Sequence, residues 1–169
     1  MLKREKTSKM SEKKKILFIC THNSARSQMA EGIMKSLYSK YYDVYSAGTE
    51  PSELNPHAVK AMKEIGLDIS KQRSKSIDKF HDVRFDYVIT VCDQAKESCP
   101  FFPGGVIIHK GFKDPSQSSG TEDEIMAVFR KVRDEIKTWI KETFENKAGR
   151  KKIKISIGKI NKSHFPWNI

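Results

Sequence analysis

Apolar runs and amphipathic segments alternate along the chain. The stretch Lys15–Ile19 is apolar after its first residue, as is typical of strands buried in a parallel sheet. Similar short segments predict strands over 42–47, 86–91 and 106–109. We therefore expect four strands, with helical segments between them.

The intervening segments carry helical periodicity and helix start signals. Met29, Ile33 and Leu37 recur every four residues, which predicts a helix over 28–39. Asn55-Pro56 places a capping residue before a proline at the first helical position, and Gly66 would end that helix. A shorter helix is expected over 77–83.

A long final helix is predicted from Thr121 onward. Thr121-Glu-Asp-Glu124 has the capping-box pattern, and Ile125, Phe129, Val132 and Ile136 follow on one side. The alternation of strands and helices predicts an α/β fold, a three-layer αβα arrangement with a four-stranded parallel sheet. Ligands of such folds bind at the carboxyl ends of the strands.

Charge is concentrated at the two ends of the chain. The 169 residues carry a net charge of +11. Residues 1–15 contribute +5 (seven Lys/Arg, two Glu) and residues 146–169 contribute +7, which leaves 11 − 5 − 7 = −1 for residues 16–145. We predict a disordered basic tail over 1–14, one domain over 15–145, and a basic extension over 146–169 that begins with a linker at Asn146–Gly149. Since the body is near neutral, no specific nucleic-acid binding is expected.

No apolar run approaches the ~20 residues that span a membrane. The first 15 residues also lack the apolar core of a secretory signal. We therefore expect a cytoplasmic protein without membrane association, and a monomer.

The stretch from Cys20 to Ser27 is the strongest chemical signal. It joins a strand to a helix, so its backbone N–H groups and the helix N-terminus would favour a bound anion. Arg26 can hold two anion oxygens with its planar guanidinium, Ser27 can donate to the Cys20 thiolate, and Asn23 can fix the loop. We predict a nucleophilic Cys20 with a lowered pKa. The oxyanion-binding loop would comprise Thr21, His22, Asn23, Ser24, Ala25, Arg26 and Ser27.

Two further cysteines and one aspartate extend this candidate site. Cys92 follows a predicted strand, so it can share a sheet edge with Cys20. Cys99 lies seven residues later, about 10 Å away if 92–99 were helical, so a disulfide there would require unwinding. Their spacing is not that of a zinc site, and we expect no metal. Asp114, in an Asp-Pro turn, suits a general acid, although a plain turn aspartate is equally consistent.

These residues resemble the thioredoxin-coupled arsenate reductases, which share the low-molecular-weight protein tyrosine phosphatase fold. The resemblance runs from about Lys15 to Phe144. The motifs that carry it are Cys20–Gly32, Tyr45-Ser-Ala-Gly48, Asn55-Pro56, Val91-Cys92, Cys99-Pro100, Gly111-Phe112, Asp114-Pro115 and Val132-Arg-Asp-Glu-Ile136.

The resemblance implies a role for each site residue. Cys20 would attack arsenate, held by Arg26 and the loop amides, with Asp114 protonating the leaving hydroxyl. Cys92 would then attack Cys20 to release arsenite, and Cys99 would attack Cys92 to give a disulfide that thioredoxin reduces. Phosphate or sulfate would bind as arsenate analogues.

The chain departs from the family pattern at three positions. Ala25 stands where many relatives have Cys, which favours the reductase over the phosphatase branch. His22 stands where Gly is common, and His tolerates unusual backbone angles better than most residues. Some relatives bind potassium through an Asn, a Glu and an acidic residue; Asn23 and Glu31 match, but Lys75 in place of the acid argues against potassium here.

Two other functions remain open from the sequence. A low-molecular-weight tyrosine phosphatase would use Cys20, Arg26 and Asp114 and form a phosphocysteine, without needing Cys92 or Cys99. The aromatic residue that this branch usually has after Asp-Pro is replaced by Ser116-Gln117. The third hypothesis is a binding protein with basic tails, in which the loop only holds phosphate.

Overall fold

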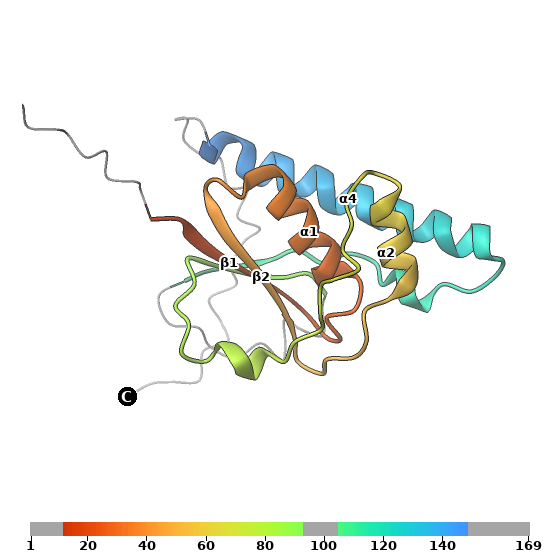
Figure 1. The fold of residues 1–169 in the computed structure, drawn as a ribbon, viewed down its shortest axis with the longest axis horizontal. Coiled ribbons are helices and arrows are strands. Elements are labelled where there is room, and N and C mark those ends of the chain that lie inside the picture. Colours follow the sequence, from red (N-terminus) through yellow and green to blue (C-terminus); the bar gives the residue numbers. More distant parts are fainter. Residues whose placement is uncertain (1–11, 93–104, 149–169) are drawn as a thin grey trace, which may run out of the picture.

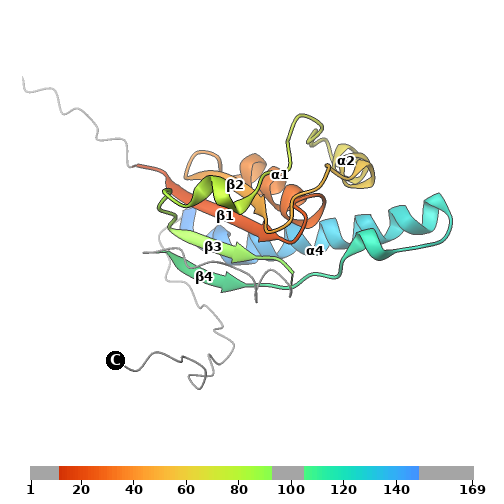
Figure 2. The same cartoon turned by 90° about the horizontal axis from the view of Figure 1, so that it is seen from below.

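The computed structural model describes residues 12–92 and 105–148. Its sheet has four parallel strands: β1 (Lys14–Cys20), β2 (Tyr42–Gly48), β3 (Tyr87–Thr90) and β4 (Val106–His109). Their order is β2-β1-β3-β4, as Figure 2 shows. This confirms the predicted four-stranded parallel sheet. Because β1 is central, Cys20 lies at the carboxyl end of a strand with neighbours on both sides.

In the described residues, three α-helices pack beside the sheet: α1 (Arg26–Tyr38), α2 (Pro56–Lys63) and α4 (Glu122–Ala148). Helix α1 contacts both α2 and α4, and the three lie together in Figure 1. Tyr45 of β2 points to the other side, where its ring meets Phe80 of the 3₁₀ helix η1 (Ile77–Phe80) and Phe85. The sheet is therefore covered on both faces.

The predicted helix signals form the contacts expected of them. The Asn55 side chain accepts from the backbone N–H groups of His57 and Ala58 at the start of α2. In the capping box, Thr121 N–H donates to Glu124 and Glu124 N–H donates to the Thr121 hydroxyl. A second short 3₁₀ helix, η2 (Pro115–Gln117), was not predicted; Asp114 caps it by accepting from Ser116 N–H.

The structure departs from prediction on the buried face of α1 and at the end of α4. Leu37 is exposed, and Tyr38 is buried in its place at the end of α1. Helix α4 continues to Ala148, through three residues of the expected linker. Along α4, the predicted Phe129, Val132 and Ile136 are almost fully buried, as are Ile140 and Phe144 further on, whereas the predicted Ile125 is only partly buried. The expected helical turns at 93–98 and Cys99 lie outside the described residues, as do residues 1–11 and 149–169 of the two basic ends. Lys14, predicted to belong to the N-terminal tail, is the first residue of β1.

No helix in the described part of the chain is long and apolar enough to cross a membrane.

Candidate active site

The loop after β1 folds around the Cys20 sulfur. The backbone N–H of Asn23 donates to Cys20 Sγ at 3.1 Å, and Ser27 Oγ lies 2.8 Å from the same sulfur. Asn23 Nδ2 donates to Ser27 Oγ at 2.8 Å, so the Ser27 proton is left to point at sulfur. The predicted Ser27–Cys20 contact and the tying role of Asn23 are both present in this geometry.

The strained position of the loop is Asn23. Its φ is 48°, in the left-handed region that Asn tolerates better than most residues. We had expected His22 to carry unusual angles; instead its ring approaches the Glu50 carbonyl oxygen, 3.0 Å from Nδ1. Asn23 is fully buried, and its side chain is surrounded by polar partners that stabilise this conformation.

The loop also requires a glycine in the neighbouring strand. Gly48, at the end of β2, pairs with Cys20 in the sheet. A Cβ atom at Gly48 would lie 2.7 Å from the Thr21 carbonyl oxygen and 2.9 Å from the Asn23 nitrogen. Both are backbone atoms that cannot move without reshaping the loop, so the close approach depends on glycine.

Arg26, at the start of α1, connects the loop to the segment after β4. Its side chain is nearly buried and forms an ion pair with Asp114, 2.9 Å between Nη2 and Oδ2. It also donates from Nη1 to the Phe112 carbonyl oxygen at 3.1 Å. The structure thus brings Arg26 and Asp114 together across 88 residues of sequence.

Cys92 lies beside the loop, as its place after β3 predicts. Its sulfur is 3.4 Å from Thr21 Oγ1, and the side chain is fully buried. Both Cys20 and Cys92 are present as thiols. The described structure therefore brings together four of the five predicted catalytic residues; the fifth, Cys99, lies beyond the described part of the chain.

The pKa of Cys20 contradicts the sequence-based expectation. Burial raises the pKa of this thiol, while the Ser27 hydroxyl, the Ser27 backbone N–H and Arg26 act in the opposite direction. Nearby Cys92 raises the pKa further. We predicted a lowered pKa because the donors were visible in the sequence and the depth of burial was not. The thiolate must therefore form against the cost of desolvation.

A polar network that sequence reasoning missed supports the loop from behind. Gln28 is fully buried; its Nε2 donates to the Asn23 carbonyl and side-chain oxygens and to the Arg73 carbonyl. Ser74 Oγ also donates to the Asn23 carbonyl oxygen, at 2.6 Å. The available signal was the polar residue Gln28 beside apolar Met29 and Ala30 at the start of a buried helix.

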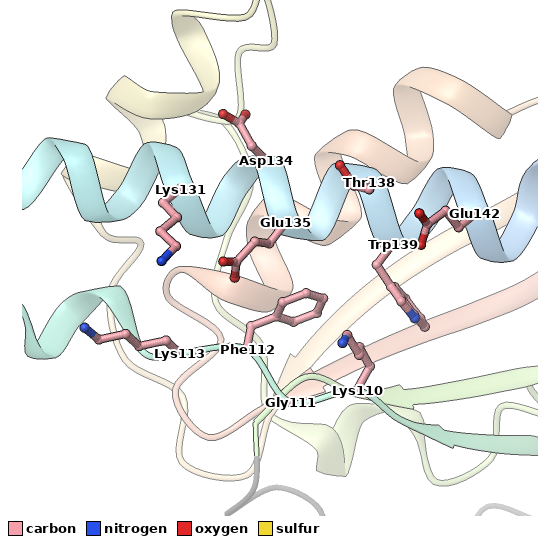
Figure 3. Close-up of a pocket in the computed structure, with 10 residues that line it drawn as sticks. All are labelled: Lys110, Gly111, Phe112, Lys113, Lys131, Asp134, Glu135, Thr138, Trp139 and Glu142. Atoms are coloured by element: carbon pink, nitrogen blue, oxygen red, sulfur yellow. The ribbon is translucent and has the colours of Figure 1, made fainter. Parts of the chain in front are cut away.

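A pocket of about 570 Å³ lies between α4 and the 110–113 segment (Figure 3). Phe112 and Trp139 form an edge-to-face pair there, with ring centroids 6.2 Å apart. The remaining lining residues are Lys110, Gly111, Lys113, Lys131, Asp134, Glu135, Thr138 and Glu142. None of the residues from Cys20 to Ser27 lines this pocket. The candidate anion site is therefore the loop after β1 and not the pocket.

The described residues contain no group of three or more His, Cys, Asp or Glu side chains that could hold a metal ion. The residues matching the potassium ligands of relatives also do not fit a cation site: the Lys75 ammonium lies 3.6 Å from Glu31 Oε2. A positive charge of the chain itself thus faces the carboxylate.

The loop folded around Cys20, Arg26 at the start of α1 and Asp114 opposite it have the arrangement expected of a cysteine-based, phosphatase-like oxyanion site. The model of the low molecular weight phosphotyrosine protein phosphatases matches residues 15–154, and the chain belongs to this family. The predicted fold class is thereby confirmed.

Relatives in the reductase branch are particularly similar. An arsenate reductase from Halalkalibacterium halodurans is 52% identical over 130 residues, covering 76% of this chain and 94% of the relative. A solved arsenate reductase in the phosphate-binding state has a TM-score of 0.64 at 34% identity, covering 79% and 98%. A thioredoxin-dependent arsenate reductase from Corynebacterium glutamicum has a TM-score of 0.59 at 30% identity, covering 78% of this chain and 62% of that one. The predicted resemblance to arsenate reductases is confirmed.

Proposed function

We propose that this protein reduces arsenate to arsenite, with Cys20 as nucleophile and thioredoxin as the final reductant. The observation that carries the proposal is the convergence of Cys20, Arg26, Asp114 and Cys92 at one edge of the sheet. A phosphatase requires the first three residues, whereas a second buried thiol beside the nucleophile loop suits electron transfer.

The first step is a displacement at arsenic. The Cys20 thiolate forms a sulfur–arsenic bond while the bond from arsenic to one arsenate hydroxyl breaks, and Asp114 gives that hydroxyl a proton so that it departs as water. Arsenate oxygens would replace Asp114 as the partner of Arg26, since guanidinium binds oxyanions in the same forked geometry. Asp114 would then lie beside the bound anion, within reach of the leaving hydroxyl.

The second step moves two electrons to arsenic. The Cys92 thiolate attacks Cys20 Sγ, a disulfide forms, and the electrons of the broken sulfur–arsenic bond remain on arsenic, which leaves as arsenite. Thiol–disulfide exchange by Cys99 then releases Cys20 and leaves a Cys92–Cys99 disulfide. The two thiols of thioredoxin reduce that disulfide and become oxidised in turn. The thioredoxin dependence of the C. glutamicum relative supports this last step.

The test is arsenate-dependent NADPH oxidation in the presence of thioredoxin and thioredoxin reductase. We expect activity in the native chain and its loss in both Cys92→Ser and Cys99→Ser, with hydrolysis of a small aryl phosphate retained in both variants. Native chain that hydrolyses the aryl phosphate but does not reduce arsenate would contradict the proposal. It would establish the second candidate, a tyrosine phosphatase, which the family membership favours.

A further inference from the structure

Glu31 is a buried carboxylate close to the nucleophile loop. It lies on α1, and its side chain is only 5% exposed. The Ser46 hydroxyl donates to Glu31 Oε2. A carboxylate removed from water is costly unless positive charge or hydrogen-bond donors compensate it, so its partners decide whether it stays ionised.

Two lysines supply the positive charge, from different places. Lys35, one turn further along α1, contacts Glu31 Oε1 with an ammonium that is half exposed. Lys75 comes from the segment before η1, lies 3.6 Å from Glu31 Oε2, and also donates to the Arg73 carbonyl oxygen at 2.7 Å. Burial lowers the pKa of Lys75 and Glu31 acts to raise it, as expected for an ammonium drawn toward a buried anion.

A chain of hydrogen bonds with a fixed direction leads from Glu31 to the Cys20 sulfur. Ser46 gives its proton to Glu31 and accepts from Asn23 Nδ2 at 2.9 Å. The other Nδ2 proton goes to Ser27 Oγ, which directs the Ser27 proton to sulfur. Because Asn23 Oδ1 accepts from the backbone N–H of Lys75, the amide is fixed in this orientation.

We infer that Lys75 is a positioning residue whose ammonium is the built-in cation of this network, so that Cys20 requires no added monovalent cation. The ammonium compensates the charge of the buried Glu31 carboxylate, which accepts from the Ser46 hydroxyl. Ser46, Asn23 and Ser27 are then aligned to donate toward the sulfur. This inference rests on Cys20 acting as the nucleophile of the proposed function.

The network separates the two contributions of Lys75. The backbone N–H of Lys75 donates to Asn23 Oδ1 whatever side chain is present. The interaction of Lys75 with Glu31, in contrast, comes only from its side-chain ammonium. Lys75→Met therefore removes the charge and keeps the backbone bond. Lys75→Arg keeps the charge. Lys71→Met removes an exposed lysine four residues away and controls for the change in net charge.

The experiment measures the rate at which iodoacetamide alkylates Cys20, followed by mass spectrometry at pH 7.5 without arsenate or thioredoxin. Each protein is compared in potassium chloride and in choline chloride at equal ionic strength. In choline, we expect Lys75→Met to react about tenfold more slowly than native, because uncompensated Glu31 no longer holds Ser46, Asn23 and Ser27 aligned toward the sulfur and the thiolate fraction falls. Potassium should restore much of the rate, because the ion can occupy the space left beside Glu31.

Native chain, Lys75→Arg and Lys71→Met should react at similar rates in both salts. Lys75→Met reacting like native in choline would overturn the inference, and so would native Cys20 that needs potassium to react. If Lys75→Met folds poorly, its melting temperature in the two salts gives the same answer. A potassium-specific rise supports the inference, and equal melting temperatures contradict it.

This assay is independent of the proposed reaction. If native chain fails to reduce arsenate but Lys75→Met alkylation shows the potassium effect, only the proposed function falls.

Discussion

Two of the ion pairs formed by residues of helix α1 are of opposite construction. At the start of the helix, the cation Arg26 is 8% exposed and its partner Asp114 is 26% exposed. Less than two turns later, the anion Glu31 is 5% exposed and its partner Lys75 is 24% exposed. In each pair, the inner charge belongs to the helix and the outer charge to a distant loop.

The difference shows which partner can be exchanged. A buried cation whose outer partner is a carboxylate can accept another oxyanion in that place, which is what a substrate requires. A buried anion whose outer partner is an ammonium can accept only another cation. The first pair therefore suits catalysis and must open, while the second suits support and should remain closed.

Breaking the first pair on its inner side should have the largest effect. Arg26→Lys keeps the charge but loses the forked geometry, and we expect kcat/KM for arsenate to fall about a thousandfold, the scale for losing an oxyanion-binding donor. Steady-state kinetics in the thioredoxin-coupled assay measures it. Arg130→Lys, in an exposed pair with Glu64, is the control and should stay near native. Near-native kinetics in Arg26→Lys would remove Arg26 from oxyanion binding.

Breaking the same pair on its outer side should be less severe. Asp114→Asn cannot donate the proton to the leaving oxygen, and we expect the first chemical step to slow about a hundredfold. Phosphate affinity should stay the same or rise slightly, because Arg26 loses a competing carboxylate. Single-turnover kinetics and phosphate inhibition measure the two quantities, with Asp123→Asn as an exposed control. Unchanged turnover would exclude Asp114 as the acid.

Breaking the second pair should affect stability more than chemistry. Glu31→Gln removes the buried charge but keeps an acceptor for Ser46, so we expect the free energy of unfolding to fall by about 1–2 kcal/mol. Urea unfolding measures it. Glu122→Gln is the matched control, since Glu122 also faces two basic side chains, His57 and Lys60, but at the surface. Equal losses in the two variants would mean that burial does not increase the contribution of the Glu31 charge to the free energy of unfolding.

The smallest effect concerns Cys20. In the unfolded chain this thiol ionises near its ordinary pKa of about 8.5, whereas burial in the fold raises its pKa. Above that pH the folded state binds more protons than the unfolded state, so stability should fall as pH rises. Urea unfolding from pH 7 to 10 should show a shallower decline for Cys20→Ala. Parallel declines would contradict the raised pKa.

Local sequence signals predicted the elements well and the sheet order not at all. The strand predictions agree with the observed ends to within one residue, because apolar runs and polar breaks lie next to each other in sequence. The exchange of Leu37 for Tyr38 in the core is different. It depends on how α1 packs against α4 and β2, and the ring of Phe144, which packs edge-to-face on Tyr42, comes from a segment far away in the sequence.

The site was predictable where strand ends bring residues together. Cys20, Cys92 and Asp114 all follow predicted parallel strands, so their meeting could be expected from topology. The partnership of Glu31 with Lys75 spans 44 residues and follows no motif, and the raised pKa of Cys20 depends on burial by the whole domain. Such properties arise from tertiary packing and are not contained in any local pattern.

The hydrogen bonds of the Asn23 side chain also determine at which stage of folding the loop can form. The Asn23 amide joins Ser27 to Ser46 and to the backbone of Lys75, which are 23 and 52 residues away from it. Contacts between distant segments carry the cost of closing long loops, and they form only after the segments have met. A nascent chain that has not yet been synthesised as far as Lys75 therefore lacks part of the hydrogen bonding that supports the loop around Cys20. The chemistry of Cys20 begins only when β1, β2 and the 73–76 segment have assembled.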